Sequence, residues 1–129
     1  MFDRYLICED SLRRCTVDGQ DGFSFDVRIG YYRGVRLSLV EAIDVSVDGQ
    51  TIPREATRFT VKGRSHTFDE MESIVDERWE MGERATLSVQ WPEGLRPGPH
   101  DVEVRELIRI SYGPGHTRAA DAKQLVLES

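Results

Sequence analysis

Three histidines are the side chains of this sequence best suited to proton transfer or metal binding at neutral pH, because imidazole titrates near neutrality and coordinates transition metals. They are His66, His100 and His116, far apart along the chain and beside turn-forming residues. None lies four residues from another, the spacing that would put two ligands on one face of a helix. We therefore expect ordinary surface or turn histidines, with no catalytic or metal-binding role.

The two cysteines, Cys8 and Cys15, lack the C-x-x-C spacing of zinc sites and redox motifs. Glu9 and Asp10 follow Cys8, and their charges should raise the pKa of its thiol and so reduce the thiolate that a nucleophile requires. The sequence also has no glycine-rich phosphate loop and no serine in a nucleophile elbow. We therefore predict no catalytic residue, no metal and no other cofactor on this chain. Unpaired cysteines and a charged N-terminal sequence favour a cytoplasmic location.

One cluster has the composition of a binding surface. Tyr31, Tyr32 and Arg33 lie between two glycines, directly after a predicted strand. Tyrosine, tryptophan and arginine offer large contact areas with a polar end and are enriched among the anchors of protein interfaces. We predict that Tyr31, Tyr32, Arg33 and Trp79 bind a partner. The alternative is that one tyrosine closes the core while the other lies on the surface, and that Trp79 anchors the edge of the core.

Composition limits the class of protein. The chain has 129 residues, a formal net charge of -6 and a pI near 5.1. A chain of this length can bury enough surface for one core, so we expect a single domain over residues 1–129. The negative charge would repel a phosphate backbone, which argues against nucleic acid as a partner. No apolar run approaches the roughly 20 residues that span a bilayer, which argues against a membrane protein.

The elements that would position these residues are mostly strands. Apolar and polar residues alternate with a period of two, which gives each strand one buried and one solvent-facing side. Asp48-Gly49 predicts a hairpin turn, residues 92–99 a proline-rich turn, and residues 113–122 a loop. Strands are predicted at residues 23–29, 43–47, 50–52, 57–62, 85–91, 101–112 and 123–127.

Two features depart from this alternation. Thr67 and Glu70 have the spacing of a capping box, which predicts one short helix from Asp69 to Val75. Glu106 falls on the apolar side of its strand, where we expect a β-bulge or a strand twisting out of the core; a functional carboxylate is the alternative. The sequence predicts an all-β fold, an antiparallel β-sandwich or a small barrel, with one short helix.

Several short stretches of the sequence are not specific one by one, but their order and spacing together resemble a known family. They are GFSFDVRI at 22–29, YYRG at 31–34 followed by LSL at 37–39, VDG at 47–49, RWE at 78–80, GLRPGPH at 94–100 and IRISY at 108–112. Over nearly the whole chain they resemble the small β subunit of bacterial C-glycoside deglycosidases.

The resemblance implies a β-sandwich that works in complex with a larger TIM-barrel α subunit. That subunit is expected to hold a divalent metal, manganese, together with the groups that transfer protons. The substrate implied is an aromatic C-glycoside whose sugar has been oxidised at its 3-position. The ketone acidifies the neighbouring carbon, so that a base can begin an elimination that breaks the carbon–carbon bond and expels the aglycone.

Three functions therefore compete at this point. The first is the auxiliary β subunit of a carbon–carbon lyase. The second is a stand-alone carbohydrate-binding sandwich, which should present exposed aromatic residues in a groove of the size of a sugar. The third is a small enzyme that uses a histidine and carboxylates in a cleft of the sandwich.

Overall fold

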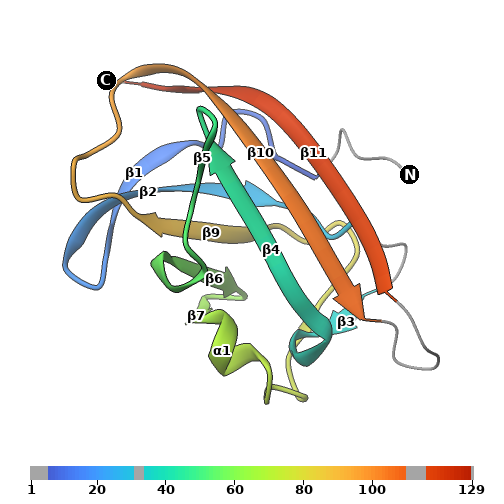
Figure 1. Cartoon of the computed structure of the whole chain (residues 1–129). Helices are drawn as coiled ribbons and strands as arrows, with labels where there is room; N and C mark the ends of the chain where they lie inside the picture. The colour runs from blue at the N-terminus through green and yellow to red at the C-terminus, as the bar shows by residue number, and fades with distance from the viewer. Residues whose placement is uncertain (1–5, 31–33, 110–115, 129) are drawn as a thin grey trace.

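A computed structural model describes residues 6–30, 34–109 and 116–128, which form two larger antiparallel sheets and one small two-stranded sheet (Figure 1). The five-stranded sheet has the order β1-β2-β9-β6-β7, and the four-stranded sheet the order β11-β10-β4-β5. The first contains β1 (Arg13–Val17), β2 (Gln20–Val27), β6 (Thr57–Val61), β7 (Arg64–His66) and β9 (Ala85–Gln90). The second contains β4 (Val40–Val47), β5 (Gln50–Thr51), β10 (Gly98–Arg109) and β11 (His116–Leu127), while β3 (Val35–Arg36) pairs with β8 (Arg78–Trp79).

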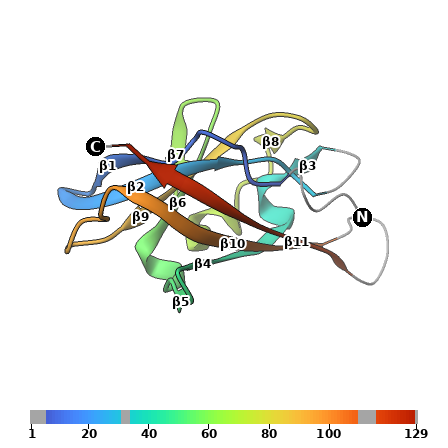
Figure 2. The ribbon, with the colours of Figure 1, turned by 90° about the horizontal axis from the view of Figure 1, so that it is seen from above.

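The two larger sheets face each other across the core, as the view from above shows (Figure 2). Their inward residues are the apolar members of each alternation, so β9 buries Ala85, Leu87 and Val89 while Thr86 and Ser88 stay partly exposed. The described strands form separate sheets and no closed barrel. The predicted all-β sandwich is therefore confirmed.

Aspartate–glycine pairs make two of the described hairpin turns, and Lys62-Gly63 makes the turn between β6 and β7. Asp48 and Gly49 adopt φ of 51° and 82°, and Asp18 and Gly19 adopt 49° and 81°. Two successive residues at positive φ fit the twist of the flanking strands, and glycine takes this conformation without strain. The predicted Asp48-Gly49 turn between β4 and β5 is confirmed.

The helix is present but shorter than predicted. It spans Phe68–Met71, and its capping box is complete, because the Thr67 side chain accepts from the Glu70 N–H and the Glu70 carboxylate accepts from the Thr67 N–H. Ile74 and Val75 lie beyond its end, and Val75 is exposed. Among the residues with a described structure, no helix is long and apolar enough to cross a membrane.

Several strands differ from the sequence prediction. The short strands β3, β7 and β8 were not predicted, and two longer strands, β11 and β1, also differ. Strand β11 covers residues 116–122, which were predicted to be a loop, and it pairs with β10 from His116 to Leu127. Strand β1 was not predicted; it pairs with β2 through the tight Asp18-Gly19 turn. Both strands lie at the edge of their sheet, where a weak apolar pattern suffices because only one neighbour is paired.

A short segment near the N-terminus joins the two sheets. Ile7 forms an isolated antiparallel bridge with Val27 at the end of β2. On its other side, the Ile7 N–H donates to the Asp121 carboxylate at 3.0 Å, and the Lys123 ammonium donates to the Ile7 carbonyl at 2.7 Å. Side chains of β11 thus bind the backbone of this segment, and residues 6–8 close one side of the sandwich.

Candidate functional site

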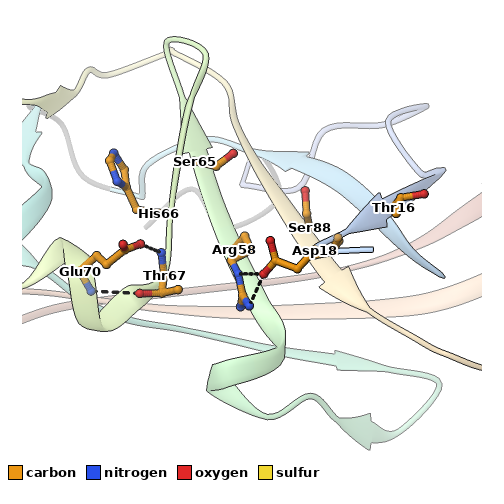
Figure 3. Close-up of a pocket in the computed structure, with 9 residues that line it drawn as sticks. Thr16, Asp18, Arg58, Ser65, His66, Thr67, Glu70 and Ser88 are labelled. Carbon is orange, nitrogen blue, oxygen red and sulfur yellow. Dashed lines mark hydrogen bonds and ion pairs between the residues drawn. The ribbon is translucent and has the colours of Figure 1, made fainter. Parts of the chain in front are cut away.

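An open pocket with a volume of about 360 Å³ lies beside the β1–β2 turn, the β6–β7 hairpin and the start of α1 (Figure 3). It is lined mostly by hydroxyl and charged side chains, and no aromatic ring lines it. The lining residues are Thr16, Val17, Asp18, Arg58, Ser65, His66, Thr67, Glu70 and Ser88. This pocket contains the histidine, the carboxylates and the hydroxyls that the small-enzyme hypothesis would require.

The acidic groups of the pocket are already engaged. Asp18 accepts two hydrogen bonds from the Arg58 guanidinium, at 2.7 Å from Nη2 and 3.1 Å from Nε. Glu70 is held in the capping box, where its Oε1 lies 2.7 Å from the Thr67 nitrogen, and this hydrogen bond lowers the pKa of the Glu70 carboxyl. Both carboxylates therefore have fixed partners within the protein, so neither is free to exchange a proton with a substrate.

The His66 ring also has a hydrogen-bond partner, the Glu77 carboxylate, which does not line the pocket. Its Nε2 lies 3.3 Å from Glu77 Oε1, and Figure 3 shows the ring turned away from Asp18 and Arg58. Ser65 is hydrogen-bonded to Thr60. The described lining of this pocket therefore lacks a nucleophile with an adjacent base. It also lacks the aromatic platform expected of the carbohydrate-binding alternative.

The structure decides the position of one of the four predicted partner-binding residues. Trp79 is fully buried: its ring packs edge-on against Phe59, with centroids 5.1 Å apart, and its Nε1–H donates to the Glu83 carbonyl at 2.9 Å. This burial favours the alternative, an anchor of the core, because a large apolar ring with one satisfied donor is more stable inside the protein. That Trp79 helps to bind a partner stays a prediction. Tyr31, Tyr32 and Arg33 lie outside the described residues.

The chain on either side of residues 31–33 is described and closely packed. The Gly30 N–H donates to Glu106 Oε1 at 2.7 Å, and the Gly34 carbonyl accepts from Arg78 at 2.9 Å. A Cβ on Gly34 would lie 2.0 Å from Glu80 Oε1 and 3.1 Å from the Glu80 Cα. Both glycines stand where a larger residue would have to displace a neighbour, so each end of the cluster is fixed against the body of the sandwich.

The other two histidines are also paired with carboxylates. His116 Nε2 lies 3.2 Å from Glu41, and His100 lies between Asp48 and the Arg96 carbonyl, each at 2.7 Å. Burial by itself would lower the pKa of His100, but the hydrogen bonds to Arg96 and Asp48 outweigh it and raise that pKa. Within residues 6–30, 34–109 and 116–128, no three His, Cys, Asp or Glu side chains gather as metal ligands.

The pKa of the Cys8 thiol is raised, as predicted, but the main cause is burial and not the neighbouring acids. Both described cysteines are free thiols. Raising the pKa keeps Cys8 as a thiol at neutral pH, so its sulfur is a weak nucleophile.

Glu106 is buried in the core and not at an exit from it. The predicted bulge is present, between Leu107 and Ile108 opposite β4, but the strand does not twist out of the core. Glu106 is 2% exposed, and burial raises the pKa of its carboxyl to about 8, against the lowering effect of the Gly30 hydrogen bond. The sequence pattern could have indicated this burial, because Glu106 alternates in step with the inward-facing residues of β10.

Comparison with known proteins identifies the family. A sequence model described as "C-glycoside deglycosidase beta subunit" matches residues 2–112. A protein of that name from Eubacterium cellulosolvens is 37% identical over 93 residues, which cover 72% of this chain and 63% of the relative. Another, from Microbacterium trichothecenolyticum, is 35% identical over 87 residues, which cover 67% of this chain and 66% of the relative.

A third relative aligns over more of its length. The "3'-dehydrocarminate deglycosidase beta subunit" of a Microbacterium species is 30% identical over 114 residues, which cover 88% of this chain and 83% of the relative. The first two relatives are matched over slightly less than two thirds of their own length. The match of the family model extends over most of the chain, from the segment that closes the sandwich to the end of β10. This chain therefore belongs to the C-glycoside deglycosidase beta subunit family.

Proposed function

We propose that this chain is the non-catalytic β subunit of a C-glycoside deglycosidase, a carbon–carbon lyase that acts on 3-oxo-C-glycosides of aromatic aglycones. The observation that carries the proposal is the family match over residues 2–112. The described pocket supports it, because its acids and its histidine are held in internal pairs and leave no free acid–base group. A subunit of this kind needs a partner for the chemistry.

We infer that the partner is a larger TIM-barrel α subunit that carries the base and a divalent metal, manganese. When bound, such a metal would polarise the sugar ketone. The base removes a proton from the carbon beside the ketone, and a carbon–carbon double bond forms within the sugar. The bond to the aglycone breaks, its electron pair leaves with the aglycone carbon, and that carbon takes up a proton. We place the complex in the cytoplasm, where free thiols such as Cys8 and Cys15 persist.

The role of this chain in the complex is to bind the α subunit, with Tyr31, Tyr32 and Arg33 as the contact residues. Aromatic and arginine side chains are frequent interface anchors. The glycines on either side of them are held to the sandwich through Glu106 and Arg78. The aglycone is proposed as flavonoid or anthraquinone in type; the name of one relative includes 3'-dehydrocarminate, which makes that compound a suitable first substrate.

Co-expression with a candidate α subunit tests the proposal. We expect the two chains to co-elute in size-exclusion chromatography and to release the aglycone from 3'-dehydrocarminate, with neither chain active alone. Lyase activity of this chain alone would contradict the non-catalytic role. Sugar binding by the isolated chain, without co-elution, would favour the carbohydrate-binding alternative.

A further inference from the structure

Strand β10 places a carboxyl group in the apolar core, and among the described residues no stabilising charge lies beside it. Glu106 is 2% exposed on the inward face of its strand, in line with Val104 and Ile108. Its Oε1 accepts the Gly30 N–H at 2.7 Å, while its Oε2 is buried without a hydrogen-bond partner among the described residues. An apolar residue would fill this position without the cost of burying a carboxyl group, so packing alone does not explain the glutamate.

The contact that Glu106 makes joins both sheets. A Cβ on Gly30 would lie 2.4 Å from the Ala119 Cβ, 3.1 Å from Leu6 Cδ2 and 3.2 Å from Glu106 Oε1. Gly30 follows β2 of the five-stranded sheet, Glu106 and Ala119 face each other on β10 and β11 of the four-stranded sheet, and Leu6 belongs to the closing segment. The Gly30 backbone is therefore closely packed against Ala119, Leu6 and Glu106, and this packing resists small displacements of Gly30.

The charge state of Glu106 decides how well this contact is maintained. With its proton on Oε2, the neutral group buries one unpaired hydroxyl; without it, the group buries an anion with a single hydrogen bond, which costs far more. Because its pKa is about 8, most of the protein carries the neutral form at pH 7.

Among the residues that the structure describes, no neighbouring charge offsets the ionised form. On β11, Asp121 and Lys123 are engaged with the Ile7 backbone. The inward residues of β4, including Ile43 directly opposite Glu106, are apolar. Arg28, two residues before Gly30, has no ion pair to Glu106 within the described part of the chain, and burial and the Gly30 hydrogen bond alone shift the carboxyl's pKa. With these described neighbours, ionisation is relieved by moving the carboxylate toward water, away from Gly30.

We propose that Glu106 is a positioning residue for subunit assembly: its neutral carboxyl holds Gly30 in the arrangement that the α subunit recognises, and its ionisation weakens assembly. The inference rests on the proposed function, because it acts through the chain segment that carries the partner contacts. Gly34, at the other end of that segment, is held by the exposed Arg78–Glu80 pair. Of the two contacts that hold the ends of this segment, the one made by Glu106 is buried and depends on whether its carboxyl group is protonated.

The test is the affinity for the α subunit between pH 6 and 9.5, with the folded state verified by circular dichroism at each pH. If only the neutral form binds, the neutral fraction falls from about 0.9 at pH 7 to about 0.1 at pH 9 for a pKa of about 8, so Kd should rise about tenfold. Glu106→Gln retains a carbonyl oxygen for the Gly30 N–H and cannot ionise. The Kd of this variant should therefore not show the rise of about tenfold between pH 7 and pH 9. Glu103→Gln, on the outward face of β10, is the matched control and should follow the wild type.

A second readout does not depend on the partner. The Gly30 amide resonance of the isolated chain should titrate with a midpoint near pH 8 in wild type and in Glu103→Gln, and not in Glu106→Gln. Parallel pH profiles of assembly for wild type and Glu106→Gln would overturn the inference while leaving the proposed function intact. The same holds for a Gly30 resonance that does not respond to pH in the wild type. Absence of assembly at every pH would instead refute the proposed function, and the inference with it.

Discussion

His100 on β10 and Asp48 in the β4–β5 turn are joined by a contact of 2.7 Å between Nδ1 and Oδ2. The opposite ring nitrogen lies 2.7 Å from the Arg96 carbonyl, and the second oxygen of Asp48 accepts the Asp101 N–H at 2.8 Å. A neutral imidazole can donate to only one of its two acceptors, so this geometry favours the imidazolium. The pair fastens the hairpin turn to the proline-rich loop before β10.

The first prediction concerns the pH range in which this pair stabilises the fold. The pKa of His100 is raised, so its contribution is complete below the ordinary value near 6.5 and is lost as pH rises through the raised value. The pKa of Asp48 is lowered, chiefly by His100, so its contribution is lost as pH falls below its ordinary 3.8 toward the lowered value. NMR titration of the His100 ring should give a pKa above 6.5, and Asp48→Asn should reduce it. A ring that titrates below 6.5 would contradict the pairing.

The second prediction concerns Glu106 and the stability of the isolated chain. The folded pKa is about 8 against an ordinary 4.5, so between these pH values the folded state holds a proton that the unfolded state has lost. The free energy of unfolding should therefore decrease with rising pH by up to about 1.4 kcal/mol per unit in this window and level off above pH 8. Urea unfolding from pH 5 to 9 measures it. Glu106→Gln should remove this part of the slope, and an unchanged slope would show that the group is not buried as described.

The third prediction concerns Gly30. A methyl group there would overlap the Ala119 Cβ at 2.4 Å, so Gly30→Ala should lower the free energy of unfolding by roughly 1–3 kcal/mol, the range of overpacked cores. Ala119→Gly removes the overlapping atom, and the double variant should be less destabilised than the sum of the two single changes. A thermodynamic cycle from urea unfolding decides this. Additive effects would mean that the two sites do not touch.

The fourth prediction separates the core role of Trp79 from an interface role. Trp79→Phe removes the hydrogen bond to the Glu83 carbonyl and part of the packing on Phe59, and should cost about 1–3 kcal/mol of stability. Because the side chain is fully buried, the affinity of the folded variant for the α subunit should be unchanged. Denaturation and titration calorimetry measure the two quantities separately. Weaker assembly with unchanged stability would restore Trp79 to the interface.

The fifth prediction concerns Tyr32 and Arg33. Replacing either with alanine should weaken assembly by about 2 kcal/mol, the typical loss for a central interface anchor. Lyase activity should then fall at low protein concentration and recover when either subunit is in excess. A variant that assembles fully but turns over slowly at any concentration would indicate a role in the active site.

The local sequence determined much of the fold because the relevant interactions are short in range. Alternation at Ala85–Gln90 predicts a strand with one buried face, and Asp48-Gly49 predicts a tight turn, since both follow from backbone geometry alone. The Thr67–Glu70 capping box was also predicted correctly, because its two hydrogen bonds connect residues three apart. The resemblance to the family likewise followed from the order of short stretches.

What the tertiary structure decided involves partners that are distant in sequence. The first half of β11 is rich in small and polar residues with low strand preference, and it becomes a strand because β10 offers a long row of backbone partners. The alternation of β10 put Glu106 on the apolar side, but only packing against Gly30, 76 residues away, shows a buried carboxyl and not an exit from the core. Trp79 was ambiguous in sequence because its ring suits both environments, and the space beside Phe59 resolves it.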